Sequence, residues 1–189
     1  MAGLPPCLVL TAGFGTRLRP LTCLKAKPAL PVAGDPLVTR ILRWLAAAGV
    51  ERFVLNLHHL PETIQAVVGD GSALGVEVRY SFEDPILGSA GGVRRALPLL
   101  AASRVLVANG DTLTDVDLHA MLAAHAASGA LVTMALVPNE EPARYGGVLV
   151  DAAGAVTGFV PRGSAPPSWH FVGVQVLEAH ALSTVSPDH

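Results

Sequence analysis

The feature that most constrains the fold is an early apolar run that leads into a glycine-rich, cationic loop. Residues 5–11 are apolar at odd and even positions alike, which is typical of a strand buried on both faces of a parallel sheet. The run continues into Gly13-Phe14-Gly15, and no acid appears before Asp35. Four cations follow the turn: Arg17, Arg19, Lys25 and Lys27. Glycines let backbone N–H groups approach an anion and cations offset its charge, so this loop is predicted to bind a polyphosphate.

Composition places the chain among folded globular proteins. Of 189 residues, 51% are hydrophobic and 15% are charged, which excludes a disordered segment and predicts one domain with a substantial core. No apolar run reaches the roughly 18 residues of a membrane span, and the N-terminal residues lack the features of a signal peptide. Cys7 and Cys23 are therefore expected to be free thiols in a reducing cytoplasm.

The distribution of charge is more informative than its total. A net charge of −2 gives no reason to expect a nucleic acid as partner. Residues 1–34 carry four cations and no acid, whereas the other 155 residues carry nine basic and fifteen acidic side chains. Positive charge is therefore concentrated around the glycine loop.

Strand and helix patterns alternate through the first two thirds of the chain. Further strands are expected at 52–57, 76–80 and 104–108. Helices are expected at 36–48 with Pro36 at N1, at 61–68, after the glycine-rich segment 83–92 up to about residue 100, and at about 115–128 with Thr114 as cap. This alternation predicts an α/β fold with a parallel sheet and helices on both faces.

The final third is richer in strands. Strands are expected at 130–137, 146–150, 155–160 and 171–177, forming an antiparallel extension over the carboxyl edge of the sheet. The expected organisation is one domain, 1–189. Within it, 1–137 is expected to be the α/β part that carries the cationic loop, and 138–189 a strand-rich part.

Several common phosphate and catalytic motifs are absent. A dinucleotide fingerprint requires a third glycine where Leu18 stands, and no Walker loop or nucleophile elbow occurs. His58 and His59 lack a second cluster with metal-ligand spacing and are interpreted as solvated loop residues. His125 is interpreted as a packed helix residue.

Asp111 follows Asn109-Gly110 at the end of the strand expected at 104–108. Open α/β sheets bind ligands at this edge, and a carboxylate there suits Mg²⁺, which prefers carboxylate, phosphate and water oxygens. Two phosphate charges about 4 Å apart repel by about 4 kcal/mol at an effective dielectric near 20. A set of Arg17, Lys27 and a metal on Asp111 is suited to cancel that repulsion.

The glycine loop resembles the signature of the sugar-1-phosphate nucleotidyltransferases, also called nucleotide-sugar pyrophosphorylases. Residues 13–22 match Gly-x-Gly-Thr-Arg-Leu-x-Pro-Leu-Thr, and 27–32 match Lys-Pro-x-Leu-Pro-Val. Segments 87–91, 109–111 and 145–148 are also similar to family segments. The resemblance implies a Rossmann-like three-layer α/β/α fold and a Mg²⁺-dependent reaction in which NTP and a sugar 1-phosphate give an NDP-sugar and pyrophosphate. It implies direct attack of the sugar phosphate oxygen on the α-phosphorus.

The resemblance also implies roles for individual residues. Arg17 neutralises the triphosphate, Lys27 holds the α-phosphate region, and Asp111 ligates the metal; these are the expected catalytic residues. The expected nucleotide-binding residues are Ala12, Gly13, Gly15, Thr16, Gly88 and Gly91. The expected sugar-phosphate residues are Gly146 and Arg162. The resemblance thus implies that 1–137 is the nucleotide-binding part and that 138–189 is an incomplete sugar-side part.

Two departures from the family pattern affect the prediction. Many members carry Glu-Lys-Pro after the late strand, where this chain has Val160-Pro161-Arg162, and an arginine fork is not equivalent to a lysine point charge. A second metal-binding aspartate usually follows beyond the last strand, so the chain is interpreted as a shortened member. The expected partners are an NTP and a sugar 1-phosphate, with no nucleic acid or membrane. Two alternatives stay open: a degenerate homologue that binds nucleotide or sugar phosphate without turnover, and a nucleotidyltransferase with a non-sugar acceptor. Base, sugar and oligomeric state are not predicted.

Overall fold

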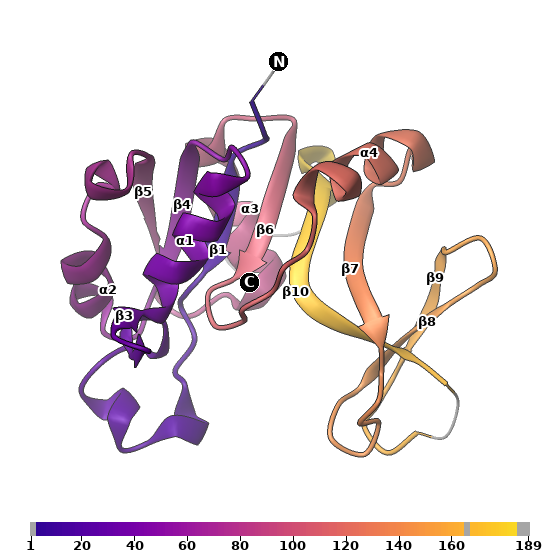
Figure 1. The fold of residues 1–189 in the computed structure, drawn as a ribbon, viewed down its shortest axis with the longest axis horizontal. Coiled ribbons are helices and arrows are strands. Elements are labelled where there is room, and N and C mark those ends of the chain that lie inside the picture. Colours follow the sequence, from indigo (N-terminus) through magenta and orange to yellow (C-terminus); the bar gives the residue numbers. More distant parts are fainter. Residues whose placement is uncertain (1–2, 165–166, 185–189) are drawn as a thin grey trace.

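The computed structural model describes residues 3–164 and 167–184 and contains one large mixed sheet (Figure 1). The strand order is β5-β4-β1-β6-β10-β8-β9, with β7 paired to β10. The first four strands of this order are parallel: β5 (Glu77–Phe82), β4 (Arg52–Leu57), β1 (Cys7–Leu10) and β6 (Arg104–Asn109). The expected parallel α/β architecture is confirmed.

Alternate side chains of the central strands pack against helices on opposite faces of the sheet. Cys7 and Val9 of β1 lie in a core with residues of α1 (Leu37–Ala47) and α2 (Pro61–Val68). Leu8 lies in a second core with residues of α3 (Gly88–Leu100). Full burial of each such side chain contributes about 1.5–3 kcal/mol, which explains why this run is apolar at both parities.

The strand-rich final third extends the sheet beyond β6. β10 (Trp169–Glu178) joins the sheet beside β6 in antiparallel register, with Val176 opposite Leu106, and its other side pairs with β7 (Val132–Pro138). β8 (Gly147–Val150) and β9 (Val156–Val160) form an antiparallel pair attached at the start of β10. Because β10 runs against β6, that start lies toward the carboxyl end of β6. The expected antiparallel extension is therefore present, and its strand β10 belongs to the sheet itself.

Several element boundaries differ from the prediction for local reasons. α4 (Leu118–Ser128) begins three residues after the expected start, because the Asp117 carboxylate, not Thr114, caps it by accepting a hydrogen bond from Ala120 N at 3.0 Å. Pro36 was expected at N1 of α1, but it ends a short hairpin and precedes the helix.

The remaining elements are short. The hairpin comprises β2 (Pro31–Val32) and β3 (Asp35–Pro36). Single 3₁₀ turns occur at Thr16–Leu18, Leu21–Cys23, Lys27–Ala29, Ser72–Leu74 and Ala179–Leu182. Within residues 3–164 and 167–184, no helix has the length and apolar character needed to cross a bilayer.

Candidate active site

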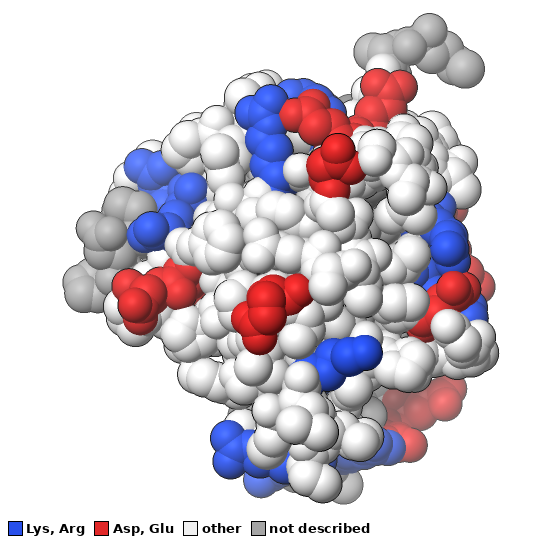
Figure 2. All heavy atoms as spheres, turned by 90° about the vertical axis from the view of Figure 1, so that its left-hand side faces the viewer, with Lys and Arg blue, Asp and Glu red and all other residues white. Residues whose placement is uncertain are grey.

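The cationic loop and Asp111 emerge from neighbouring strands at the same edge of the sheet. The loop follows β1, and Asp111 follows β6, which pairs with β1 in parallel. Gly110 N donates to the Leu10 carbonyl at 2.9 Å, so the segment carrying Asp111 is held against the end of β1. Figure 1 draws the loop after β1 at the lower end of the molecule, and in Figure 2 blue cationic atoms gather at that end. The loop and the segment carrying Asp111 therefore meet at one edge of the sheet.

Lys27 and Asp111 form an ion pair at this edge. Lys27 Nζ lies 2.6 Å from Asp111 Oδ2, with 28% and 39% of the two side chains exposed. Both groups are accessible to a ligand while already in contact with each other. The predicted convergence of the early cations and the mid-chain carboxylate is therefore observed for this pair.

A cavity of about 360 Å³ lies beside the ion pair. The loop after β1 lines it with residues 11–13 and 15–18, and the segment that leads into α3 lines it with Ile86, Gly88 and Ser89. Eight of the residues expected in the site line it: Ala12, Gly13, Gly15, Thr16, Arg17, Lys27, Gly88 and Asp111. This volume is in the usual range of small-molecule sites, and the lining includes the cations Arg17 and Lys27.

The other three expected residues lie elsewhere. Gly91 is buried within α3 and is not among the cavity-lining residues. Gly146 and Arg162 lie beside each other next to β8 and β9, where a Cβ on Gly146 would stand 3.7 Å from Arg162 N. They too are absent from the lining, and their assignment to the sugar phosphate stays a prediction.

A buried polar network that was not predicted from the sequence connects the start of the loop after β1 to the segment before α3. The Asn56 side chain accepts from Thr11 N at 2.7 Å through Oδ1 and donates to Glu83 Oε1 at 2.8 Å through Nδ2. Thr11 Oγ1 also donates to the Asn56 carbonyl, and Leu87 N donates to Glu83 Oε2 at 2.9 Å. Glu83 is only 3% exposed, yet it lines the cavity. The signal available in the sequence was a polar residue near the end of each of two adjacent strands.

The donor set fits a magnesium ion that is completed by substrate. No group of three or more His, Cys, Asp or Glu side chains with metal-binding geometry occurs among the described residues. Mg²⁺ commonly uses one or two carboxylates together with water and substrate phosphates, so Asp111 alone meets the minimum protein contribution.

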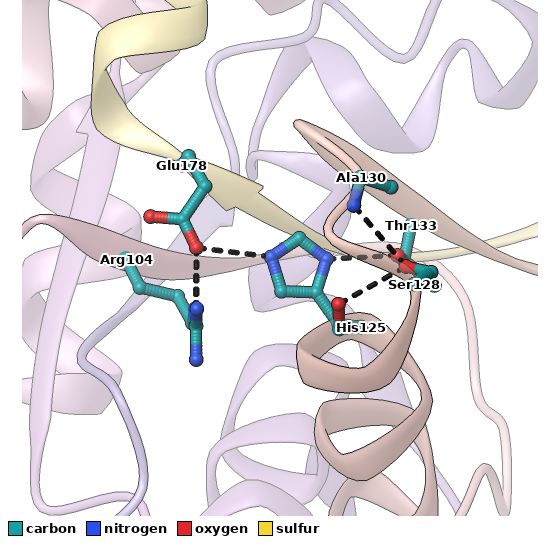
Figure 3. Close-up of polar contacts among 6 residues, drawn as sticks. All are labelled: Arg104, His125, Ser128, Ala130, Thr133 and Glu178. Carbon is teal, nitrogen blue, oxygen red and sulfur yellow. Dashed lines mark hydrogen bonds and ion pairs between the residues drawn. The ribbon is translucent and has the colours of Figure 1, made fainter.

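His125 lies outside the cavity and is confirmed as a packed helix residue. Its ring is 1% exposed, with Nδ1 2.8 Å from Thr133 Oγ1 and Nε2 3.2 Å from Glu178 Oε1 (Figure 3). The same Glu178 oxygen accepts from Arg104 Nε at 2.7 Å. The group links α4 to β6, β7 and β10, and the hydrogen bond from Arg104 holds the pKa of Glu178 below its ordinary value.

Comparisons with known proteins converge on one family. The family model described as nucleotidyl transferase matches residues 7–183. The chain is 37% identical over 179 residues to mannose-1-phosphate guanylyltransferase of Mycobacterium tuberculosis, covering 94% of this chain and 50% of that protein. It is 47% identical over 114 residues to N-acetylmuramate alpha-1-phosphate uridylyltransferase of Neisseria meningitidis, covering 60% of this chain and 49% of that protein. The chain thus spans about half the length of these curated relatives.

A solved structure supports the fold assignment. HddC from Yersinia pseudotuberculosis superposes with a TM-score of 0.86 at 23% identity, covering 98% of this chain and 81% of that one. At this identity the match concerns the arrangement of helices and strands. It agrees with the three-layer α/β architecture described above.

Proposed function

The chain belongs to the nucleotidyl transferase family, and from this premise we propose that it transfers a nucleotidyl group from an NTP to a sugar 1-phosphate. The observation that carries the proposal is the meeting of Lys27 and Asp111 at the rim of a cavity that Arg17 also lines. The curated relatives are named as guanylyl- and uridylyltransferases of sugar 1-phosphates, which supports the reaction class.

In the proposed reaction an oxygen of the sugar phosphate attacks the α-phosphorus of the NTP. A new P–O bond forms, the bond between the α-phosphorus and its bridging oxygen breaks, and pyrophosphate leaves with the bonding electrons. Both reactants are anionic, so the protein must reduce their repulsion and hold them in line. Lys27 and Arg17 both line the cavity, and in this scheme Lys27 would contact the α-phosphate and Arg17 the leaving pyrophosphate.

Asp111 would hold Mg²⁺ in this scheme. The ion would supply positive charge to the phosphate oxygens, in addition to the two cationic side chains. Backbone N–H groups of the loop from Ala12 to Thr16 would bind further phosphate oxygens.

We assign the two parts of the chain to the two substrates. Residues 1–137 contain every cavity-lining residue and would bind the nucleotide. Residues 138–189 would form the sugar side, with Gly146 and Arg162 contacting the sugar phosphate. A cytoplasmic location remains part of the proposal, because nucleotide triphosphates are available there.

A pyrophosphate-release assay tests the proposal directly. The four NTPs are combined with a panel of sugar 1-phosphates in the presence of Mg²⁺, using wild type, Lys27→Ala, Asp111→Asn and the control His119→Ala. We expect release with at least one pair, loss in the two site variants, and no change in the control, whose exposed histidine lies on α4. Nucleotide binding without release would instead support the degenerate, non-catalytic alternative, and release with a non-sugar acceptor would support the second one.

A further inference from the structure

Two adjacent histidines after β4, His58 and His59, were expected to be solvated, but both are half-buried and each contacts a carbonyl of another segment. His58 Nδ1 lies 2.9 Å from the Glu83 carbonyl, and His59 Nε2 lies 2.7 Å from the Thr22 carbonyl. A carbonyl oxygen only accepts, so each of these ring nitrogens carries a proton and donates it. The pair therefore joins the segment before α3 to the cationic loop.

Phe14 brings the loop into contact with the same two rings. Its ring lies edge-on to His58 at 5.1 Å between centroids, and tilted against His59 at 5.6 Å. Gly13 and Gly15 on either side line the cavity, but among the described lining residues Phe14, His58 and His59 do not occur. The Phe14 ring thus contacts the histidines outside the cavity, while the neighbouring Gly13 and Gly15 line the cavity.

The loop has little burial to hold it in place. Leu18, Leu21 and Leu24 are 40%, 59% and 83% exposed, respectively. Segments with few buried apolar contacts open at low free energy unless specific interactions hold them. The contact through Thr22 is such an interaction, since Thr22 is buried and its hydroxyl donates to the Gly15 carbonyl at 3.0 Å.

The conformation of Gly15 explains why the contact through Thr22 matters for the cationic loop. Its φ of +60° is a left-handed conformation that favours glycine, and a Cβ there would stand 2.9 Å from the Thr22 side chain. Thr22 therefore packs directly against the tightest turn of the loop. His59 contacts Thr22, which follows Gly15, and both histidines contact Phe14, which precedes Gly15. The histidines therefore contact the loop on both sides of Gly15.

We propose that Phe14, His58 and His59 form a clamp that positions the cationic loop relative to the segment before α3 for nucleotide binding. They are positioning residues, because they act through Gly15, Thr22 and Glu83 and do not contact the ligand. The inference takes the identity of the ligand, an NTP, from the proposed function. The clamp itself does not depend on that function. A preformed loop binds more tightly because less ordering is needed on binding.

Limited proteolysis measures the clamp without reference to catalysis. Trypsin can cut the loop after Arg17 and after Lys25, whereas Pro20 and Pro28 protect the bonds after Arg19 and Lys27. Cleavage after Arg104, which precedes the buried Val105, reports global unfolding in the same digest. Loop opening and whole-domain unfolding are therefore separated in one experiment.

The variants are chosen to remove or keep single contacts. Phe14→Ala and His59→Ala remove the ring contact, and His59→Ala also removes the donor to Thr22. His59→Gln keeps an N–H donor near the Nε2 position, and His119→Ala is the matched control. Phe14 is 42% exposed, so its truncation leaves the fold intact even if a histidine variant does not fold.

We expect loop cleavage in Phe14→Ala and His59→Ala to be roughly 3- to 10-fold faster, as the energy of one aromatic contact implies, with cleavage after Arg104 unchanged. His59→Gln should cleave at a rate between those of wild type and His59→Ala. In the double variant Phe14→Ala/His59→Ala, the increase in cleavage rate should be smaller than the product of the two single increases, because both contacts belong to one unit. Titration with a fluorescent NTP analogue should show weaker binding by a similar factor. KM for the sugar 1-phosphate at saturating NTP should stay at the wild-type value.

The two proposals fail in different ways. Wild-type loop cleavage and NTP affinity in Phe14→Ala and His59→Ala would overturn the clamp, whether or not the enzyme turns over. Faster loop cleavage together with weaker NTP binding would support the clamp even if the wild type released no pyrophosphate, an outcome that would overturn only the proposed reaction.

Discussion

The Lys27 ammonium contacts the Asp111 carboxylate at 2.6 Å across a sequence separation of 84 residues. The pair is partly exposed, so its contribution to stability is small, about 0.2–1 kcal/mol. Its position at the rim of the cavity therefore has more consequence for ligand binding than for folding. Stability and activity should separate when either partner is replaced.

Lys27→Ala and Asp111→Asn should each reduce turnover by roughly 10²–10³-fold, the usual effect of removing one charge-stabilising group. Thermal unfolding measured beside the pyrophosphate assay should show a midpoint close to wild type. If the unfolding midpoint of a variant fell strongly and its turnover decreased only in proportion to the folded fraction, the ion pair would have a structural role instead.

Arg17→Ala should weaken triphosphate binding more than monophosphate binding. Arg17 lines the cavity, and a guanidinium there gains most from the charge that a triphosphate adds. Calorimetric titrations with an NTP and the matching NMP measure the difference. Arg43→Ala, on α1 and paired with Asp35, is the control for loss of one arginine, and equal losses for both nucleotides would contradict the role assigned to Arg17.

Gly92→Ala should destabilise the protein by about 1–3 kcal/mol and weaken nucleotide binding. The new methyl group would stand 2.5 Å from Glu83 Oε1 and 2.9 Å from Asn56 Nδ2, which forces the buried pair to move. Urea unfolding and nucleotide titration measure the two effects. In Gly158→Ala the methyl group would meet only an ordinary contact at 3.9 Å, so we expect a change within about 0.5 kcal/mol.

Acid stability should depend on Glu178. The hydrogen bond from Arg104, assisted by His125, holds its pKa in the folded state below the ordinary 4.5 of the unfolded chain. Its stabilising contribution is thus complete above pH 4.5 and is lost as the pH falls through the lowered folded value. The free energy of unfolding should therefore fall less steeply on acidification below pH 4.5 in Glu178→Gln than in wild type.

The control for this measurement is Glu77→Gln. It removes an exposed carboxylate paired with Arg79 on a single strand, so it changes the net charge equally without touching the contacts between α4 and the sheet. Wild-type and Glu178→Gln curves of equal slope in acid would contradict the assigned coupling.

The location of the site was predictable because strand order has a direct geometrical consequence. Once the runs ending near Leu10 and Asn109 were recognised as strands of one parallel sheet, their carboxyl ends had to share an edge, and the structure shows that the two strands are neighbours. Arg17, Lys27 and Asp111 follow those ends within short segments. The buried pair of Asn56 and Glu83 was not predicted because a single asparagine or glutamate carries no motif, and their pairing requires β4 and β5 to lie in one register.

Sequence alone therefore determined the local features: apolar strands, helix periodicity and a cationic glycine loop, each set by residues close together in the chain. Only the tertiary structure decided that β10 inserts beside β6, that Asn56 meets Glu83, and that His58 and His59 contact Phe14. The physical reason is that such pairings depend on which distant groups satisfy one another's hydrogen bonds and surfaces when the whole chain packs. No short window of sequence contains that information.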